Sequence, residues 1–180
     1  MISSCINHLR RFRRDEDGSS ILIEFMLFVP IIFSTFLMAT EMGIYQMRQM
    51  QLDRGLDVAV REVRLNTSTQ YTHDQFKDMI CANTGWLEDC STNIKLEMNT
   101  VNPRNFAAFD TTPDCLDTSD GDPQPPRGFT HGLQNDMMML RACIRFRPVF
   151  PTSGLGRTFT TDGAGLARMT STAAFVQEPN

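Results

Sequence analysis

The apolar segment that begins at Ile21 constrains the fold of this chain more than any other feature. From Ile21 to Ala39 the only charged side chain is that of Glu24. A bilayer core about 30 Å thick is spanned by about 20 apolar residues in a helix, and this segment reaches that length. A charge at the centre of such a helix costs roughly 2.5–3.5 kcal/mol, so ionisable residues inside membrane segments are functional candidates. Glu24 is therefore the first candidate site.

Basic residues before the apolar segment predict its orientation. The arginines are Arg10, Arg11, Arg13 and Arg14, and no basic cluster of that density directly follows the segment. By the positive-inside rule the N-terminus stays in the cytoplasm and the rest of the chain is exported. A removed secretory signal would have a shorter apolar core and an A-x-A-like site. Residues 39–43 match that site poorly and lead into a helical pattern, which favours a spanning helix.

Composition limits what can follow the membrane segment. The chain has 180 residues and a net charge of −4, and its mean hydropathy is −0.24. These values permit one modest exported domain, and they argue against a protein with many membrane spans. The acidic balance gives no indication of nucleic-acid binding.

The cysteines agree with export. Cys5 belongs to the basic leader, and the exported part holds an even number, as disulfides in an oxidising compartment require: Cys81, Cys90, Cys115 and Cys143. Four cysteines allow three connectivities, and the sequence alone does not decide between them. Proximity favours Cys81–Cys90, which leaves Cys115–Cys143.

Periodicity predicts that one long helix continues beyond the membrane. Apolar residues recur at steps of four, three and four at Leu52, Leu56, Ala59 and Val63. The polar residues 66–69 mark its end. We expect a leader over 1–19, a transmembrane helix over 20–40, a helix continuation over 41–66 and an exported domain over 67–180. The helix from about residue 20 to 65 would be about 65–70 Å long, with Pro30 tolerated inside the span.

The exported domain is predicted to be a small α+β unit. Thr72 and Gln75 form the pattern of a capping box, which starts a short helix with Phe76, Met79 and Ile80 on its apolar face. Alternating apolar residues predict three strands, over residues 94–98, 138–146 and 167–176. The second strand ends at Pro148, and residues 154–156 predict a turn. We expect an antiparallel sheet of about three strands packed on the long helix.

No residues suggest a catalytic, cofactor-binding or metal site. The exported part has no C-x-x-C pair, and its only histidines are His73 and His131. The irregular segment 102–134 is rich in proline and aspartate, but its aspartate spacing does not fit a calcium loop. We interpret this segment as a surface-exposed loop anchored by Cys115. Arginines on one face of the second strand are expected to pair with acids or face solvent, and the alternative is that they bind an anionic partner: Arg141, Arg145 and Arg147.

Two blocks of sequence resemble a known family. Residues 13–25, in which the small residues Gly18, Ser19 and Ser20 precede Glu24, are similar to the leader and processing motif of the TadE-like minor pilins (pseudopilins) of the tight-adherence (Tad) pilus. Residues 41–43 and 52–64 resemble the continuation helix of that family, and residues 140–143, 151–156 and 174–179 resemble exported segments of some members.

The resemblance implies a pilin-like fold and a non-enzymatic role in Tad (type IVb) pilus assembly as a minor pilin, initiator or adaptor. It also implies a place in the bacterial inner membrane, with the C-terminal domain in the periplasm or exposed on a pilus. The implied partners are inner-membrane lipid, a prepilin peptidase that removes the leader, other pilins and Tad pilus-assembly proteins.

The position of the acid departs from the family pattern. The family usually has this acid at the fifth mature position, whereas a cut after Gly18 places Glu24 at the sixth. A cut after Ser19 restores the fifth position, so both bonds remain open, with Ser19–Ser20 slightly preferred. Cleavage would create an α-amino group that is cationic near neutral pH. Glu24 of one subunit can pair with this amine on a neighbour, which would set the register between subunits.

Two other functions compete with this interpretation. In the first, the chain is an uncleaved, single-pass envelope protein whose exported domain binds a ligand, and Glu24 extends to water at the membrane surface. In the second, the chain is an anchored exported enzyme, but the sequence offers no active-site constellation for it.

Overall fold

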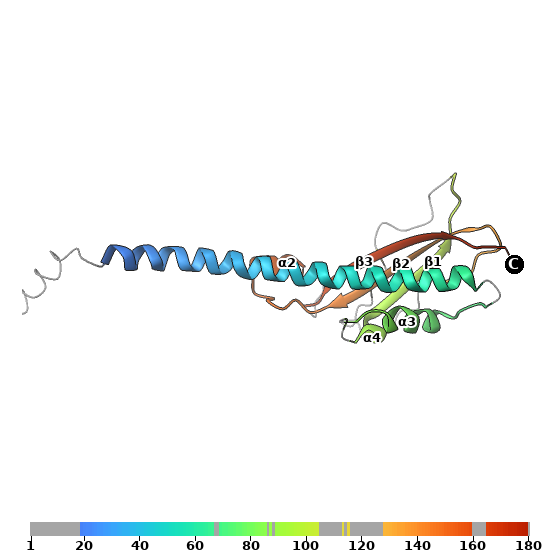
Figure 1. Cartoon of the computed structure of the whole chain (residues 1–180), viewed down its shortest axis with the longest axis horizontal. Helices are drawn as coiled ribbons and strands as arrows, with labels where there is room; N and C mark the ends of the chain where they lie inside the picture. The colour runs from blue at the N-terminus through green and yellow to red at the C-terminus, as the bar shows by residue number, and fades with distance from the viewer. Residues whose placement is uncertain are drawn as a thin grey trace, which may run out of the picture.

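The computed structural model of the protein describes residues 19–66, 69–85, 87, 89–104, 113, 115, 128–159 and 165–179. Its elements, in chain order, are α2 (Ser19–Leu65), α3 (His73–Ala82), α4 (Cys90–Asn93), β1 (Ile94–Thr100), β2 (Met137–Phe146), α5 (Gly154–Phe159) and β3 (Ala167–Val176) (Figure 1). A long N-terminal helix and a small three-stranded sheet confirm the predicted α+β class. The leader, and most of the predicted surface loop over 102–134, lie outside the described residues.

The predicted long helix is confirmed as one uninterrupted element. Helix α2 has 47 residues and contains Pro30, and at 1.5 Å per residue it is about 70 Å long. Figure 1 shows the N-terminal part of α2 extending away from every other described element, α5 beside its middle, and its C-terminal part running along the sheet. It ends at Leu65, where the polar residues had predicted its end.

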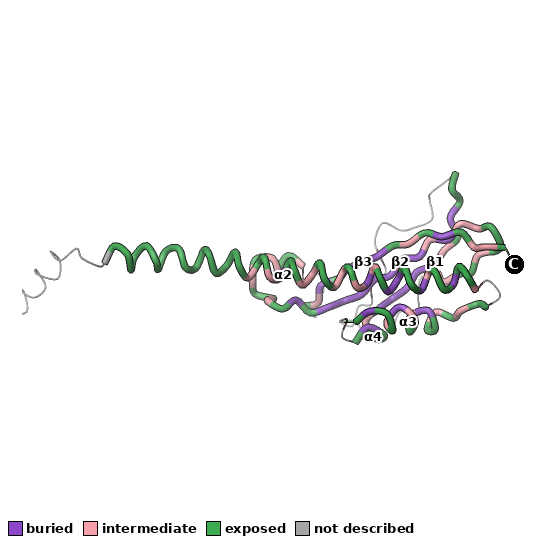
Figure 2. Tube along the Cα trace, in the orientation of Figure 1, coloured by how far each residue is buried: buried purple, intermediate pink, exposed green. Residues whose placement is uncertain are grey.

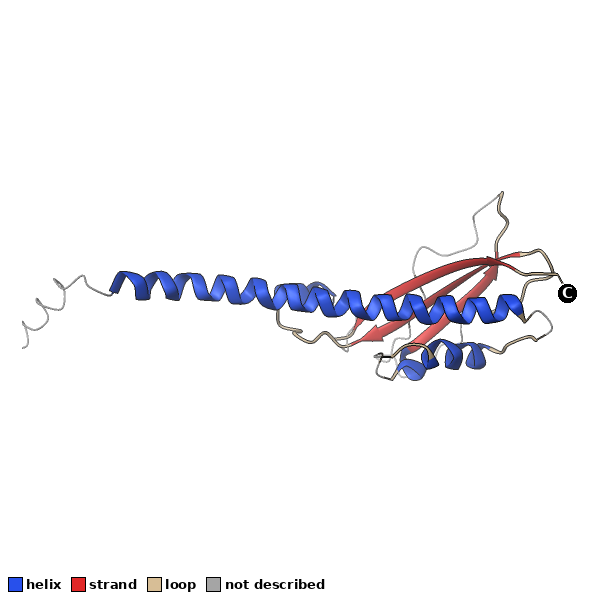
Figure 3. Cartoon of the chain, in the orientation of Figure 1, coloured by secondary structure: helices blue, strands red, loops and turns tan. Residues whose placement is uncertain are grey.

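All three predicted strands are present, and they form one antiparallel sheet in the order β1-β2-β3. Ile94 of β1 lies opposite Ile144 of β2, and Phe146 of β2 lies opposite Ala167 of β3. Helix α2 packs on β3 and on α3, and α3 packs on β1. Figure 3 shows α2 crossing in front of the strands with α3 beside it. The two helices thus share one face of the sheet.

The core lies between this face and the two helices. The predicted stripe on α2 is buried throughout, and α3 contributes Phe76 and Ile80. Strand residues complete the core, among them Leu96, Leu140, Ile144 and Met169. Figure 2 shows buried residues along the strands and α3, while the N-terminal half of α2 is exposed. The part of the chain that follows the apolar run therefore has a core that residues 20–36 do not enter.

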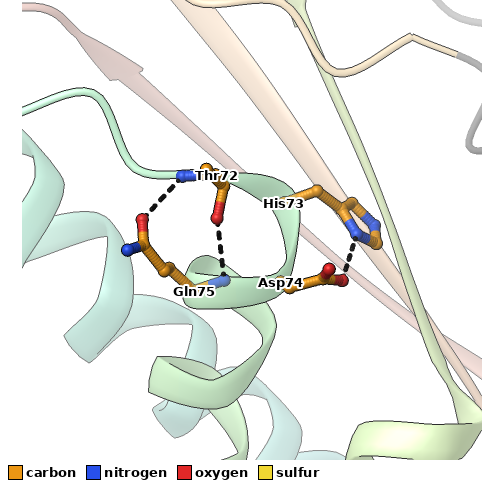
Figure 4. A network of polar contacts seen from close by, with 4 residues as sticks. All are labelled: Thr72, His73, Asp74 and Gln75. Carbon is orange, nitrogen blue, oxygen red and sulfur yellow. Dashed lines mark hydrogen bonds and ion pairs between the residues drawn. The ribbon is translucent and has the colours of Figure 1, made fainter.

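Helix α3 begins with the predicted capping box (Figure 4). The hydroxyl of Thr72 accepts a hydrogen bond from the Gln75 amide at 3.4 Å, and the Gln75 side chain accepts one from the Thr72 amide at 3.0 Å. Nδ1 of the neighbouring His73 lies 3.3 Å from a carboxylate oxygen of Asp74. These contacts fix where the chain turns back toward α2 after residue 66.

One disulfide joins α3 to α4, and a second attaches Cys115 to the sheet. Cys81 is bonded to Cys90, with 5.7 Å between their Cα atoms, and this bridge joins the end of α3 to α4. Cys115 is bonded to Cys143 of β2, with 5.4 Å between their Cα atoms. This is the pairing that proximity favoured in the sequence.

One local expectation was wrong. The turn predicted at residues 154–156 is the start of α5, because the Ser153 hydroxyl accepts the Gly156 amide at 3.0 Å, as an N-cap residue does. Lys95 and Glu97 alternate with apolar residues in β1, and both are buried. Arg141 on the adjacent strand forms an ion pair with Glu97, which compensates for burial of that carboxylate.

Candidate functional site

The candidate site is the bare, apolar half of α2. Every residue from Ser20 to Phe36 is exposed. Within the described part of the chain, α2 is the one helix long and apolar enough to cross a membrane. Its most apolar stretch has a mean hydropathy of 2.3, and none of that stretch is buried. Length and composition therefore fit a membrane span.

Three hydroxyl groups in or next to this half are satisfied within the helix. Ser34 Oγ donates to the Ile31 carbonyl at 2.9 Å, and Thr35 Oγ1 donates to the Ile32 carbonyl at 2.8 Å. Thr40 Oγ1 donates in the same way to Phe36 at 2.9 Å. Polar groups in an apolar medium need such internal partners. These three side chains are therefore compatible with lipid and do not require another protein.

Glu24 differs from these hydroxyl residues. No hydrogen bond or ion pair joins its carboxylate to another residue in the described part of the chain, and its side chain is exposed. Of the predicted processing site, Gly18 lies outside the described residues and Ser19 is the first residue of α2. Ser20 and Glu24 are four residues apart in the helix, so they lie on the same face one turn apart. An α-amino group created at Ser20 would therefore lie on the same side of the helix as the acid.

A second carboxylate on α2, that of Glu41, was not identified from the sequence as a candidate site residue. Glu41 follows directly on the apolar run, and only 1% of it is exposed. Its Oε1 accepts the Val149 amide at 3.0 Å, and its Oε2 accepts the Phe150 amide at 2.7 Å. Both partners are backbone groups more than a hundred residues away in the chain. No side-chain pattern could have indicated them.

These two amides belong to the β2–α5 loop, residues 147–153. The loop and α5 lie against α2 at the end of the apolar run. A Cβ added at Gly154 would stand 2.8 Å from Cε of Met38, and one added at Gly156 would overlap the Phe150 carbonyl oxygen. Because Gly156 has no side chain, α5 packs closely on the loop that Glu41 holds.

Beside the loop is an arginine cleft, a hollow of about 320 Å³ between α2, the α3–α4 region and the end of β2. Arg48, Arg145 and Arg147 line it together with Asp89. The Arg48 guanidinium lies 5.1 Å from the centre of the Phe146 ring, and its Nη1 donates to the Arg147 carbonyl at 3.0 Å. Arg48 is thus held in place while Arg147 is exposed.

The three arginines singled out in the sequence have different surroundings. Arg141 pairs with Glu97 and Arg147 faces solvent, as expected. Arg145 is 4% exposed, so it does not belong to a solvated face. A second cavity, of about 160 Å³, lies near the far end of the domain and is lined by Phe76, His131 and Glu178 among others. Across the described residues, no cluster of three or more His, Cys, Asp or Glu side chains could hold a metal ion.

The chain was compared with models of protein families, with curated proteins and with solved structures, and none of the three comparisons finds a match.

Proposed function

We propose that the chain is a non-enzymatic, TadE-like pilin component of a tight-adherence (type IVb) pilus assembly system, acting as a minor pilin, initiator or adaptor. The observation that supports this most directly is the division of α2. One half is bare, of membrane length, and carries a single carboxylate without a partner in the described chain. The other half, in the same uninterrupted helix, is buried against a disulfide-bonded antiparallel sheet.

The bare half would perform two tasks in this function. Its apolar side chains anchor the subunit in the inner membrane before assembly, and neighbouring apolar helices replace the lipid during assembly. Glu24 provides the directional contact. In an apolar medium a carboxylate is costly to leave without a partner, so the arrangement in which it meets the α-amino group of an adjacent subunit is favoured over other registers.

Leader removal would make this contact possible. A prepilin peptidase that cuts beside Ser19 exposes a cationic amine at the start of α2 and removes the arginine-rich segment that holds the N-terminus in the cytoplasm. The exported domain then makes the contacts with other pilins and Tad pilus-assembly proteins. Its two disulfides suit the oxidising periplasm or the cell surface.

The primary test is intact mass together with N-terminal sequencing of the protein from native membranes. A mature chain that starts at Ser19 or Ser20 supports the proposal and decides between the two bonds. A chain that retains its leader throughout its life contradicts it. That result would favour the uncleaved, membrane-anchored envelope protein. The exposed position of Glu24 near the start of the helix is also compatible with that alternative, in which Glu24 extends to water at the membrane surface.

The second test concerns the carboxylate. Glu24→Gln keeps the shape and removes the charge, and Glu24→Ala removes both. We expect both variants to insert into the membrane and to impair pilus assembly, measured by surface piliation and by recovery in sheared filaments. Glu62→Gln is the matched control, because Glu62 is an exposed acid in the same helix outside the apolar half. Normal assembly with Glu24→Ala would rule out the pairing role.

A further inference from the structure

The position of the β2–α5 loop along α2 points to a second contact with the membrane. Glu41 holds the loop, and Glu41 is the residue immediately after the apolar run, about 1.5 Å further along the helix than Thr40. Gly154 lies beside Met38, which is inside the run. If the run spans the bilayer core, this loop must lie at the level where hydrocarbon gives way to headgroups. The inference rests on the proposed function in this one respect, that residues 20–40 cross the membrane.

The chemistry of the loop fits that level. Val149 is 46% exposed although it is apolar, and Pro151 beside it is exposed as well. Arg147, two residues before Val149, is an exposed cation in the same loop. An apolar tip flanked by a basic side chain is the pattern by which proteins bind the boundary between headgroups and acyl chains.

The arginine cleft adds a site for the phosphate of a lipid headgroup. The Arg48 backbone lies eight residues beyond Thr40, about 12 Å along the helix, and so outside a headgroup layer that adds about 5–7 Å to each side of the core. Arg48 can reach that layer only through its long side chain, because side chains on a helix tilt toward its N-terminus, here the membrane end. Its side chain extends beside Arg147, and the Phe146 ring and the Arg147 carbonyl hold it in place. Guanidinium groups bind phosphate oxygens through paired hydrogen bonds.

We propose that the β2–α5 loop and the arginine cleft form a docking site for anionic phospholipid at the exported surface of the membrane. Val149 enters the headgroup–acyl boundary, and Arg147 with Arg48 binds the phosphate of a headgroup. The buried Glu41 carboxylate fixes the depth of the loop because it accepts both the Val149 and the Phe150 amides. This contact would hold the exported domain against the membrane surface until the subunit is assembled into the pilus.

Photocrosslinking on the full chain tests the depth of the loop. A benzoylphenylalanine residue replaces Val149 in protein reconstituted into vesicles of phosphatidylcholine and phosphatidylglycerol. Val58 is the matched control: it is also an exposed valine, at 40%, but lies about 25 Å beyond Glu41 along α2. We expect lipid adducts at position 149 and none at position 58. Adducts only to protein at position 149 would indicate contact with a second copy and overturn the proposal, as would the absence of any adduct.

A charge variant tests the arginines. In the same vesicles, phosphatidylglycerol should be enriched among the adducts at position 149 relative to its share of the lipid. Arg147→Gln should lower this enrichment by about five-fold, the change expected for one basic residue near an anionic surface. Arg61→Gln, an exposed arginine of α2 far from the loop, should leave it unchanged. Equal enrichment in both variants would refute the role of the arginine.

The outcomes can be separated from those of the pilin test. An N-terminally processed chain without lipid adducts at position 149 refutes this inference and leaves the pilin proposal intact. A chain that keeps its leader but forms the lipid adducts contradicts the pilin proposal and supports this inference.

Discussion

Replacing Glu41 by glutamine probes the contact that joins the end of the apolar run of α2 to the β2–α5 loop. Glutamine has the same shape, but only one of its two terminal atoms accepts a hydrogen bond. The variant keeps one of the two amide contacts and turns an N–H donor toward the other amide. A hydrogen bond to a charged group contributes about 1.5–3 kcal/mol. We therefore expect the loop to be held about 2–3 kcal/mol less tightly.

Hydrogen exchange of the full chain in detergent micelles measures this loss where it occurs. A change of 2–3 kcal/mol at about 1.4 kcal/mol per factor of ten corresponds to an exchange rate about 30- to 140-fold faster. The Val149 and Phe150 amides should show it, while amides in β1 keep their protection. Glu62→Gln, at an exposed position, should change stability by no more than about 0.5 kcal/mol. If Glu41→Gln exchanges like the parent protein at both amides, the carboxylate does not hold the loop.

Four further substitutions test the packing of the α+β domain. Gly55→Ala places a Cβ 2.9 Å from the Ile80 carbonyl oxygen and should destabilise the domain by about 1–3 kcal/mol in denaturant unfolding. Gly43→Ala meets nothing within 4 Å and should be neutral or stabilising by up to about 1 kcal/mol; the opposite order would show that close packing does not matter at α3. Thr72→Ala removes the cap of α3 and should cost about 0.5–2 kcal/mol in the same assay, and no loss would mean that the capping box adds nothing. Glu97→Ala leaves the Arg141 cation buried without this acid and should cost about 3–5 kcal/mol, which a melt near the parent temperature would contradict.

The elements whose side chains face one core could be predicted from the sequence. The stripe from Leu52 to Val63 and the alternation of β3 reflect burial on one side, and that periodicity is visible in the residues themselves. In β2 the alternation of burial holds only as far as Ala142, beyond which both faces are buried. The start of α3 was equally clear, because Thr72 and Gln75 satisfy each other's backbone over three residues. Local chemistry of this kind does not depend on the rest of the fold.

The contacts made across the fold could not be predicted. Glu41 looks like the first solvent-exposed residue after an apolar run, yet its partners are backbone amides of the β2–α5 loop. Glu97 looks like a polar residue on an outer face, and its burial depends on the register that brings Arg141 opposite it. A buried carboxylate with distant partners leaves no periodic signal.

The candidate site also has one residue that could be predicted from the sequence and a group of residues that could not. Glu24 was evident from charge alone, because a single acid interrupts a long apolar run. The arginine cleft was not, since Arg48 and Arg147 are a hundred residues apart and the Phe146 ring and a backbone carbonyl bring them together. Of the arginines that line the cleft, Arg145 and Arg147 were singled out in the sequence, as residues expected to pair with acids or face solvent.

Because α2 is unbroken, it also fixes the angle around the helix axis between Glu24 and the core stripe. Leu52 follows Glu24 by 28 residues in one helix, so the core stripe is rotated about 280° from the acid around the axis. If subunits pair through Glu24, each would therefore hold its α+β domain at one fixed angle around the helix axis. One residue inserted between Glu24 and Glu41 would swing the ectodomain by about 100° and raise it by about 1.5 Å, while every fold contact beyond the insertion survived.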